Sequence, residues 1–304
     1  MAIKRLPSTG DAPRATGVPD SLVPGGPADS AGFPWAGRTF DHHETAFEGD
    51  TGETPERLRL AVLNLRAIAA EAAAAPSAEA HWDAVARLAD AHAEVIAALG
   101  ESRVLVPMVA EAGDIGLTPE GKTVEKTQEL SIVAVAAPDG RTVLPVFSST
   151  AAMTAWNNTA RPIPVPGPQA AVAAAQEEHD LIVIDAGSAD LVYGVRRPAI
   201  AALALGERYV PAWADAEVVA AFEASAAAEP DVARVWIAPA DLAGTLAAPE
   251  VDVRIRISRA LTRPELEALL GRLQGAWAGE TVIADRVDSL RVFPMLPDNA
   301  RPAA

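Results

Sequence analysis

Apolar residues recur at helical spacing in two consecutive segments within the first hundred residues. The first stripe is Leu58, Val62, Leu65 and Ile68, and the second is Trp82, Val85, Leu88, His92, Val95 and Leu99. Residues three or four apart share one face of a helix, so each stripe predicts an amphipathic helix. Thr54 followed by Pro55 is typical of a helix start, and Ser77 is a favoured N-cap for the second helix. The pattern predicts a helical hairpin over residues 54–100.

Short apolar runs follow from residue 103 onward and predict β-strands. We expect strands over 104–108, 130–137 and 143–147, pairing antiparallel wholly or in part, with a polar loop or exposed ribbon over 111–129. The run Leu181–Ile184 is apolar at every position, as in a strand buried on both faces, and Asp185 closes it. The pattern also predicts three short helices, at 151–156, 170–178 and 199–205. The proline-rich residues 161–168 are expected to form a rigid extended segment.

The C-terminal part has its own pattern. Residues 251–257 alternate between apolar and polar, which predicts a strand with one buried face. Leu261–Leu266 forms a capping box with a hydrophobic staple. The apolar stripe of the helix that follows is Leu266, Leu269, Leu270, Leu273 and Trp277. The expected return strands contain Val282, Leu290 and Val292. Together they predict a small β-α-β unit.

These elements predict an α+β or α/β fold, a mixed sheet with flanking helices and a smaller C-terminal β-α-β unit. The expected organisation is an α/β domain over 54–205, an alanine-rich connecting segment over 206–250 and the C-terminal unit over 251–296. Trp213 and Trp236 are interpreted as packing residues.

Residues 1–53 show no apolar period and are rich in proline and glycine, so we expect a largely disordered tail. Within it, residues 29–40 carry an unusual aromatic patch. Its candidate partner-binding residues are Phe33, Pro34, Trp35 and Arg38. The patch is expected either to pack on the folded domain or to bind a partner.

Charge and composition narrow the function classes. The formal net charge of −16 disfavours non-specific binding to nucleic acid, and the absence of cysteine excludes disulfides and thiolate chemistry. No apolar run reaches the length of a membrane helix, and the N-terminus lacks a secretory apolar region. We expect a cytoplasmic protein that contacts neither membrane nor nucleic acid.

Candidate chemistry is sparse. Asp185 ends a strand, where catalytic carboxylates are common, but no histidine or second carboxylate stands at a recognisable spacing, so a turn or cap role competes. The polar run 41–44 lacks metal-ligand spacing. We therefore expect no enzyme activity, cofactor or metal.

The leading hypothesis is a protein-interaction or adaptor module, with Arg161, Arg254 and Arg256 as further candidate contacts for an unidentified protein partner. One alternative is a small-molecule binder or hydrolase centred on Asp185 and Arg161. The other is a self-associating structural protein that forms a homo-oligomer through the helical hairpin or the 251–257 edge.

Several short motifs in order resemble the N-terminal domain of the SseB family. They are Arg103-Val104-Leu105-Val106-Pro107, Leu144-Pro145-Val146-Phe147-Ser148-Ser149, Trp156 before Ala160-Arg161-Pro162, and Leu181–Asp185. The stretch from Asp29 to Arg38 resembles the leader of the actinobacterial branch. The resemblance implies a cytoplasmic protein without established catalytic residues, and a C-terminal domain that the β-α-β unit would match.

Overall fold

The computed structural model describes residues 47, 49–112, 115–117, 123–125, 128–137 and 139–297, and for 110–132 it describes the strand backbone only. All features below belong to the compact unit that begins at Gly49. The aromatic patch with Phe33, Pro34, Trp35 and Arg38, the polar run 41–44 and the predicted disorder of the tail lie outside the described residues.

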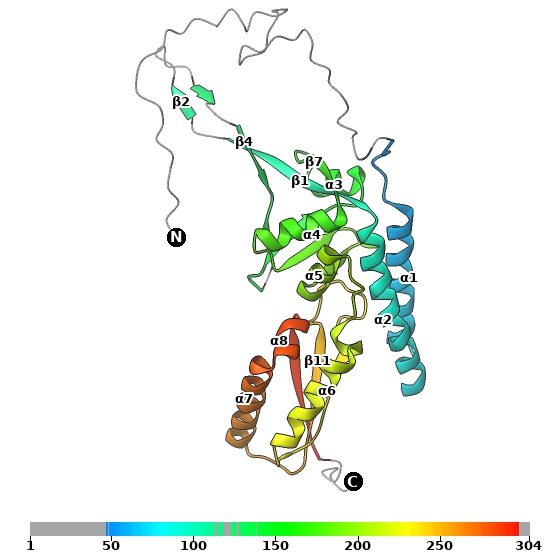
Figure 1. Ribbon diagram of the computed structural model, residues 1–304, viewed down its shortest axis with the longest axis vertical. Coiled ribbons are helices and arrows are strands. Elements are labelled where there is room, and N and C mark those ends of the chain that lie inside the picture. Colours follow the sequence, from blue (N-terminus) through cyan, green and yellow to red (C-terminus); the bar gives the residue numbers. More distant parts are fainter. Residues whose placement is uncertain are drawn as a thin grey trace, which may run out of the picture. The chain divides into compact units, whose positions relative to one another are not determined.

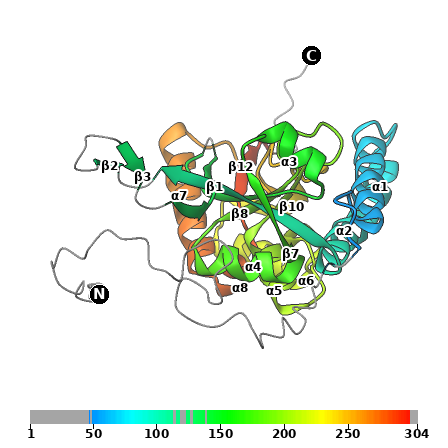
Figure 2. The ribbon, with the colours of Figure 1, turned by 90° about the horizontal axis from the view of Figure 1, so that it is seen from above.

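The predicted helical hairpin is present. Helix α1 spans Glu56–Ala73 and α2 spans Ala78–Gly100, and the two lie side by side along one flank of the sheets (Figures 1 and 2). Ser77 caps α2 by accepting a hydrogen bond from the Ala80 amide, as predicted. The predicted cap of α1 is wrong by one residue. Pro55 occupies the N-cap without a side-chain bond, because the Thr54 hydroxyl instead bonds Ser148 at 2.8 Å.

Three strands form an antiparallel sheet in the order β4-β1-β7, with bounds Gln128–Ile132, Arg103–Ala112 and Arg161–Pro166. The proline-rich segment is thus the strand β7, and it lies at the sheet edge, where proline needs no ladder partner for its missing N–H. The expected ribbon over 111–129 contains a small hairpin of β2 (Ile115–Leu117) and β3 (Thr123–Glu125).

A second sheet has the order β5-β6-β8-β9, with bounds Val135–Ala136, Thr142–Val146, Leu181–Ile184 and Tyr193–Val195. The expected antiparallel pairing holds for β1 with β4 and for β5 with β6, but β6 pairs in parallel with β8. A parallel pair needs a long crossover. Here the crossover carries α3 (Thr150–Trp156), β7 and α4 (Gly167–Gln176).

One face of this second sheet meets the helices. Leu144, Val146, Ile182 and Ile184 point into a first core that also contains buried residues of α1, α2, α4 and α5 (Arg197–Leu205). Successive strand residues point to opposite faces. Their neighbours Val143, Pro145, Leu181 and Val183 therefore face away from these helices.

A second core joins the strands β10 (Val232–Pro239), β11 (Val251–Ile257) and β12 (Leu290–Met295) to three helices. The helices α6 (Ala216–Ser225), α7 (Arg263–Gly279) and α8 (Thr281–Arg286) lie beside this sheet (Figure 1), and the 3-10 turns Ala212–Ala214 and Ala226–Ala228 flank α6. β10 pairs antiparallel with β11, and β11 pairs in parallel with β12.

The predicted β-α-β unit and its capping box at Thr262 and Glu265 are present. Val282 does not lie in a return strand, because it belongs to α8. The segment 206–250, set apart by its alanine content, supplies Phe222, Val235 and other members of the second core. Several of its larger apolar residues come in two short clusters, at 218–222 and 232–237, which the alanine-rich composition of the segment obscures.

Leu266, expected in the buried stripe of α7, is only half-buried, whereas Leu269 is fully buried. We therefore expect Leu269→Ala to lower the free energy of unfolding by about 2–5 kcal/mol, the usual cost of truncating a buried leucine. Leu266→Ala is the matched control and should cost clearly less. Chemical denaturation measures both, and equal losses would contradict the packing of α7 described above.

Candidate functional site

Asp185, the candidate catalytic carboxylate, is buried with 1 % of its surface exposed and has a left-handed backbone with φ of 49°. Its carboxylate accepts hydrogen bonds from the Ser148 amide at 2.7 Å and the Ser148 hydroxyl at 2.5 Å. Because that hydroxyl donates to Asp185, Thr54 donates to Ser148 in turn. Asp185 thus ties the end of β8 to the turn that starts α3.

Arg103 extends this network on the opposite side of Ser148. Its guanidinium donates to the Ser148 carbonyl, to the Glu53 carbonyl at 2.8 Å and to both carboxylate oxygens of Asp50. Burial raises the pKa of Asp185, while the bonds from Ser148 and the charge of Arg103 oppose that rise. Every polar atom of the Asp185 carboxylate is engaged in holding the fold, which leaves it no free oxygen for a substrate.

The other predicted contact residues lie apart from Asp185. Arg161 is exposed at the start of β7, whereas Asp185 is buried. No contact joins the two side chains, so nothing supports the hypothesis that they share a site. Arg254 and Arg256 lie on β11, in the C-terminal sheet. The described residues contain no group of three His, Asp or Glu side chains placed to hold a metal ion.

A second buried polar cluster surrounds Arg196, which immediately precedes α5 and is 6 % exposed. Its guanidinium binds Asp241 at 2.8 Å and Asp288 at 3.0 Å, and it donates to the Ala248 carbonyl at 2.8 Å. Burial alone would lower the pKa of Arg196, but these two carboxylates raise it above its ordinary value. We call Arg196, Asp241, Glu250 and Asp288 the buried hub.

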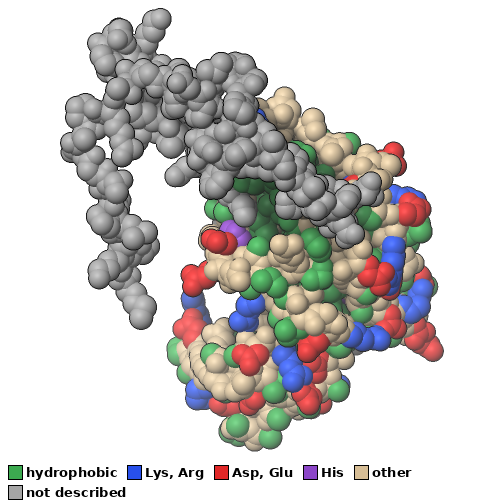
Figure 3. Space-filling model, turned by 45° about the horizontal axis from the view of Figure 1, so that its top comes forward, with side chains coloured by type: hydrophobic (Ala, Val, Ile, Leu, Met, Phe, Trp, Pro, Cys, Tyr) green, Lys and Arg blue, Asp and Glu red, His purple; other side chains and the backbone are tan. Residues whose placement is uncertain are grey.

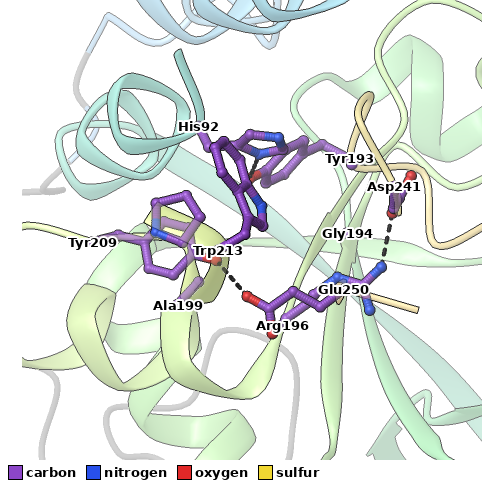
Figure 4. A pocket seen from close by; sticks show the side chains of 11 residues that line it. His92, Tyr193, Gly194, Arg196, Ala199, Tyr209, Trp213, Asp241 and Glu250 are labelled. Carbon is purple, nitrogen blue, oxygen red and sulfur yellow. Dashed lines mark hydrogen bonds and ion pairs between the residues drawn. The ribbon is translucent and has the colours of Figure 1, made fainter. Parts of the chain in front are cut away.

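Glu250 is the third acid of the hub. Its carboxylate accepts the amides of Asp288 at 2.8 Å and Ala212 at 3.2 Å, and the Tyr209 hydroxyl points at it from 3.4 Å (Figure 4). Burial raises the pKa of Glu250, and the two amide bonds oppose that rise. The hub therefore links the start of α5, the segment before α6 and the approach to β12, which come from both cores.

His92 lies above the hub, close to Tyr193 and Trp213 (Figure 4). Its Nε2 lies 3.2 Å from the Leu242 carbonyl, and its Nδ1 lies 3.0 Å from the Tyr193 hydroxyl. A carbonyl only accepts, so Nε2 carries the proton and the hydroxyl donates to Nδ1. Gly244 closes this wall with φ of 64°, where a Cβ would stand 2.5 Å from the Tyr193 ring.

The cavity enclosed by His92, Arg196, Tyr209 and their neighbours measures about 20 Å³. That volume holds about one water molecule. The hub and its aromatic cover are therefore a structural joint, with no room for a substrate.

Sequence reasoning missed the hub. Its members are far apart in the chain, at 196, 241, 250 and 288, and none belongs to a motif. The one available signal was Glu250, a carboxylate placed directly before the alternating strand β11. His92, expected on an apolar helix face, is indeed buried there.

A hollow with an apolar lining lies on the face of the second sheet that is turned away from α1, α2, α4 and α5. We call it the β6–β8 groove; its volume is about 440 Å³, and it is lined by Val135, Ala136, Ala137, Asp139, Arg141, Val143, Pro145, Trp156, Leu181, Val183, Ala186, Thr245 and Leu246. Val143 and Leu181 are buried at its floor, while Val135 is 39 % exposed at its rim. Ala186 reaches the groove but Asp185, one residue earlier, does not.

The hub shapes one wall of this groove. The Asp241 carboxylate accepts the amides of Thr245 at 3.0 Å and Leu246 at 2.8 Å, and Asp288 binds Arg141 at 3.0 Å. All three bonded residues line the groove. The wall is thus fixed by the same carboxylates that hold Arg196.

The environment of His92 predicts a dependence of stability on pH. Burial lowers the pKa of His92 to about 4, from an ordinary value of 6.5, so folding favours the neutral ring. The stabilisation is complete above pH 6.5 and is lost as the pH falls toward 4, by about 3 kcal/mol in total. Between pH 6.5 and 4, the free energy of unfolding measured by urea titration should therefore fall less for His92→Gln than for the wild type. The control His179→Gln should lose as much as the wild type. Parallel losses in wild type and His92→Gln would contradict this assignment.

Comparison with known protein families gives one match, and it lies in the region of the first core. Residues 65–202 match the family described as the SseB protein N-terminal domain, and this region includes the second half of α1, the two larger sheets of the first core, Asp185 and Arg196. No match to the chain was found among curated proteins or among solved structures. The match does not reach the leader or the C-terminal unit, so the actinobacterial branch and the C-terminal likeness stay predictions. Residues 65–202 belong to the SseB family and form its N-terminal domain.

Proposed function

We propose that this protein is a non-enzymatic interaction module that binds an apolar segment of a partner protein in the β6–β8 groove. One observation carries the proposal: the parallel pair β6 and β8 is apolar on both faces, and the face turned away from α1, α2, α4 and α5 forms the floor of the groove. Such parallel strands normally have both faces covered. A groove with an apolar floor of this kind is typical of a binding site.

The engagement of the polar groups supports a non-enzymatic role. Asp185 is bonded to Ser148, and Arg196 is bonded to Asp241 and Asp288, in each case away from any space that a substrate would need. Catalytic groups need a free atom within reach of the reacting bond. These buried side chains instead hold elements of the fold together.

The charges around the groove point to an uncharged occupant. Its two charged lining residues, Asp139 and Arg141, bind each other at 2.7 Å, and Arg141 also binds Asp288. A charged ligand would therefore lose hydration without gaining a free counter-charge. An apolar segment would lose nothing of that kind.

The proposed setting is the cytoplasm. A sequence of 304 residues without cysteine agrees with a reducing compartment, and the net charge of −16 disfavours nucleic acid as the partner. In the part of the chain that is described, no helix combines the length and apolar character that crossing a bilayer requires.

A second candidate function is the binding of a small apolar molecule in the same groove. Its volume of about 440 Å³ lies within the range typical of ligand sites. Native mass spectrometry of the purified protein would detect such a ligand as a discrete added mass. Because Asp185 does not line the groove, it would have no part in binding such a molecule.

The test places a charge at the rim of the groove. Val135 and Val172 are 39 % and 40 % exposed, but only Val135 lines the groove. Affinity capture from a lysate of the encoding organism, followed by reconstitution with the purified partner, should give wild-type binding for Val172→Glu. Val135→Glu should bind at least about tenfold more weakly, because a carboxylate would be desolvated on complex formation.

Two results would sink the proposal. One is the absence of any stoichiometric partner, and the other is a partner that Val135→Glu retains as well as the wild type. A second copy of this chain as the captured partner, seen as a dimer in sedimentation, would support the self-association alternative in its place.

A further inference from the structure

Among the described residues, the helices of the second core pack on one face of the C-terminal sheet, and the chemistry of the opposite face differs from that of the groove. Val235, Val253 and Ile255 point toward α6, α7 and α8 in the second core. The strand alternation sends their neighbours to the opposite face. On that face, β10 contributes Arg234, Trp236 and Ala238, and β11 contributes Arg256, Arg254 and Asp252 opposite them. β12 contributes Met295, Phe293 and Arg291, in the same order.

This Arg–Trp face, as we call these nine residues, is basic and aromatic. It carries four arginines against a single acid, Asp252, which binds Arg291 at 3.0 Å. The whole chain has a formal charge of −16, so this concentration of positive charge opposes the overall field. Arg234, Arg291 and Phe293 are exposed, and Trp236, Arg254 and Arg256 are half-buried.

The arginines are arranged around the aromatic rings. The guanidinium carbons of Arg234 and Arg256 lie 5.4 Å and 5.9 Å from the centre of the Trp236 ring, and that of Arg291 lies 4.8 Å from the Phe293 ring. Stacking of this kind restrains a guanidinium while its N–H groups stay available at the edge. Preorganised guanidinium groups lose less entropy when they bind a carboxylate.

Arg254 occupies the centre of the face. It stands opposite Trp236 on one side and Phe293 on the other in the strand register. Within the described part of the chain its guanidinium makes no hydrogen bond, ion pair or ring contact. A half-buried cation between two aromatic rings has every N–H free for a ligand.

We propose that the Arg–Trp face binds an acidic, extended segment of a partner protein. Side chains in an extended segment alternate, so carboxylates at every second residue would meet Arg234, Arg254 and Arg291 across the sheet. Arginine and carboxylate form paired, charge-assisted hydrogen bonds. This surface is separate from the β6–β8 groove and does not depend on it.

A single-stranded nucleic acid also combines negative charge with stacking groups. The charge of the whole chain disfavours it, since a polyanion that extends beyond this face meets a molecule of net charge −16. A short acidic segment confines its charge to the arginines. The acidic peptide is therefore the better match.

The test measures fluorescence anisotropy with the full chain and a labelled synthetic peptide in which glutamate alternates with threonine. The variant Arg234→Gln/Arg254→Gln removes two guanidinium groups that make no ion pair within the described residues. The matched control Arg208→Gln/Arg263→Gln removes the same charge at positions 71 % and 90 % exposed, outside the face. The face variant should bind about tenfold more weakly, and the control should bind as the wild type does.

Further arms separate the sources of binding. The glutamine counterpart of the peptide should not bind, and added salt should weaken the complex. Three results would overturn the proposal: no binding of the glutamate peptide, equal weakening by the control variant, or tighter binding of an oligothymidylate of equal charge. The last would make the face a nucleic-acid surface.

Discussion

The ion pairs between Arg196 and the carboxylates of Asp241 and Asp288 are the interaction on which the rest of the structure depends. Arg196 belongs to the first core by position, directly before α5, while Asp288 lies two residues before the last strand of the second core. A buried charge without its partner is costly, so the two cores cannot separate or slide without exposing or stranding these groups. Glu250 reinforces the joint through the backbone of Ala212 and Asp288.

The same joint gives the β6–β8 groove a fixed wall. Asp241 holds the amides of Thr245 and Leu246 with the carboxylate that binds Arg196, and Asp288 shares its carboxylate between Arg196 and Arg141. Buried ion pairs of this kind define a geometry more than they add stability. Acidic and basic side chains are interspersed over the surface in Figure 3. Exposed ion pairs, such as Arg208 with Asp90, contribute little by comparison.

The two proposed surfaces differ in what they require of a partner. The groove offers apolar floor residues and charges that are already neutralised by one another, whereas the Arg–Trp face offers guanidinium groups held against aromatic rings. A module with one apolar and one basic surface can recognise a partner through two chemically distinct segments. Such a requirement increases specificity, because a wrong partner would have to satisfy both.

Local sequence signals predicted most elements but not the joint between them. Periodicity and capping identified α1, α2, β8, β11 and α7 because each depends on residues close in the chain. They missed the short strand β9 and placed Val282 in a strand, since neither segment is long enough to display a period.

The candidate sites followed the same division. Arg254 and Arg256 stood out through the strict alternation of β11, but their aromatic neighbours Trp236 and Phe293 are brought to them only by the sheet register. The hub draws on residues up to 92 positions apart, as Arg196 and Asp288 are, which no local pattern connects.

The central claim is that the buried hub couples the two cores, and native-state hydrogen exchange of Arg196→Met tests it most directly. The substitution leaves the buried carboxylate of Asp241 without its ion pair and that of Asp288 with Arg141 as its remaining one, so amides of α2 in the first core and α7 in the second should lose protection together, by about 3–5 kcal/mol. Adding Asp241→Asn and Asp288→Asn should restore much of that protection, because no buried charge then lacks a partner. Loss confined to residues 241–246, with α2 and α7 as protected as in the wild type, would contradict the claim.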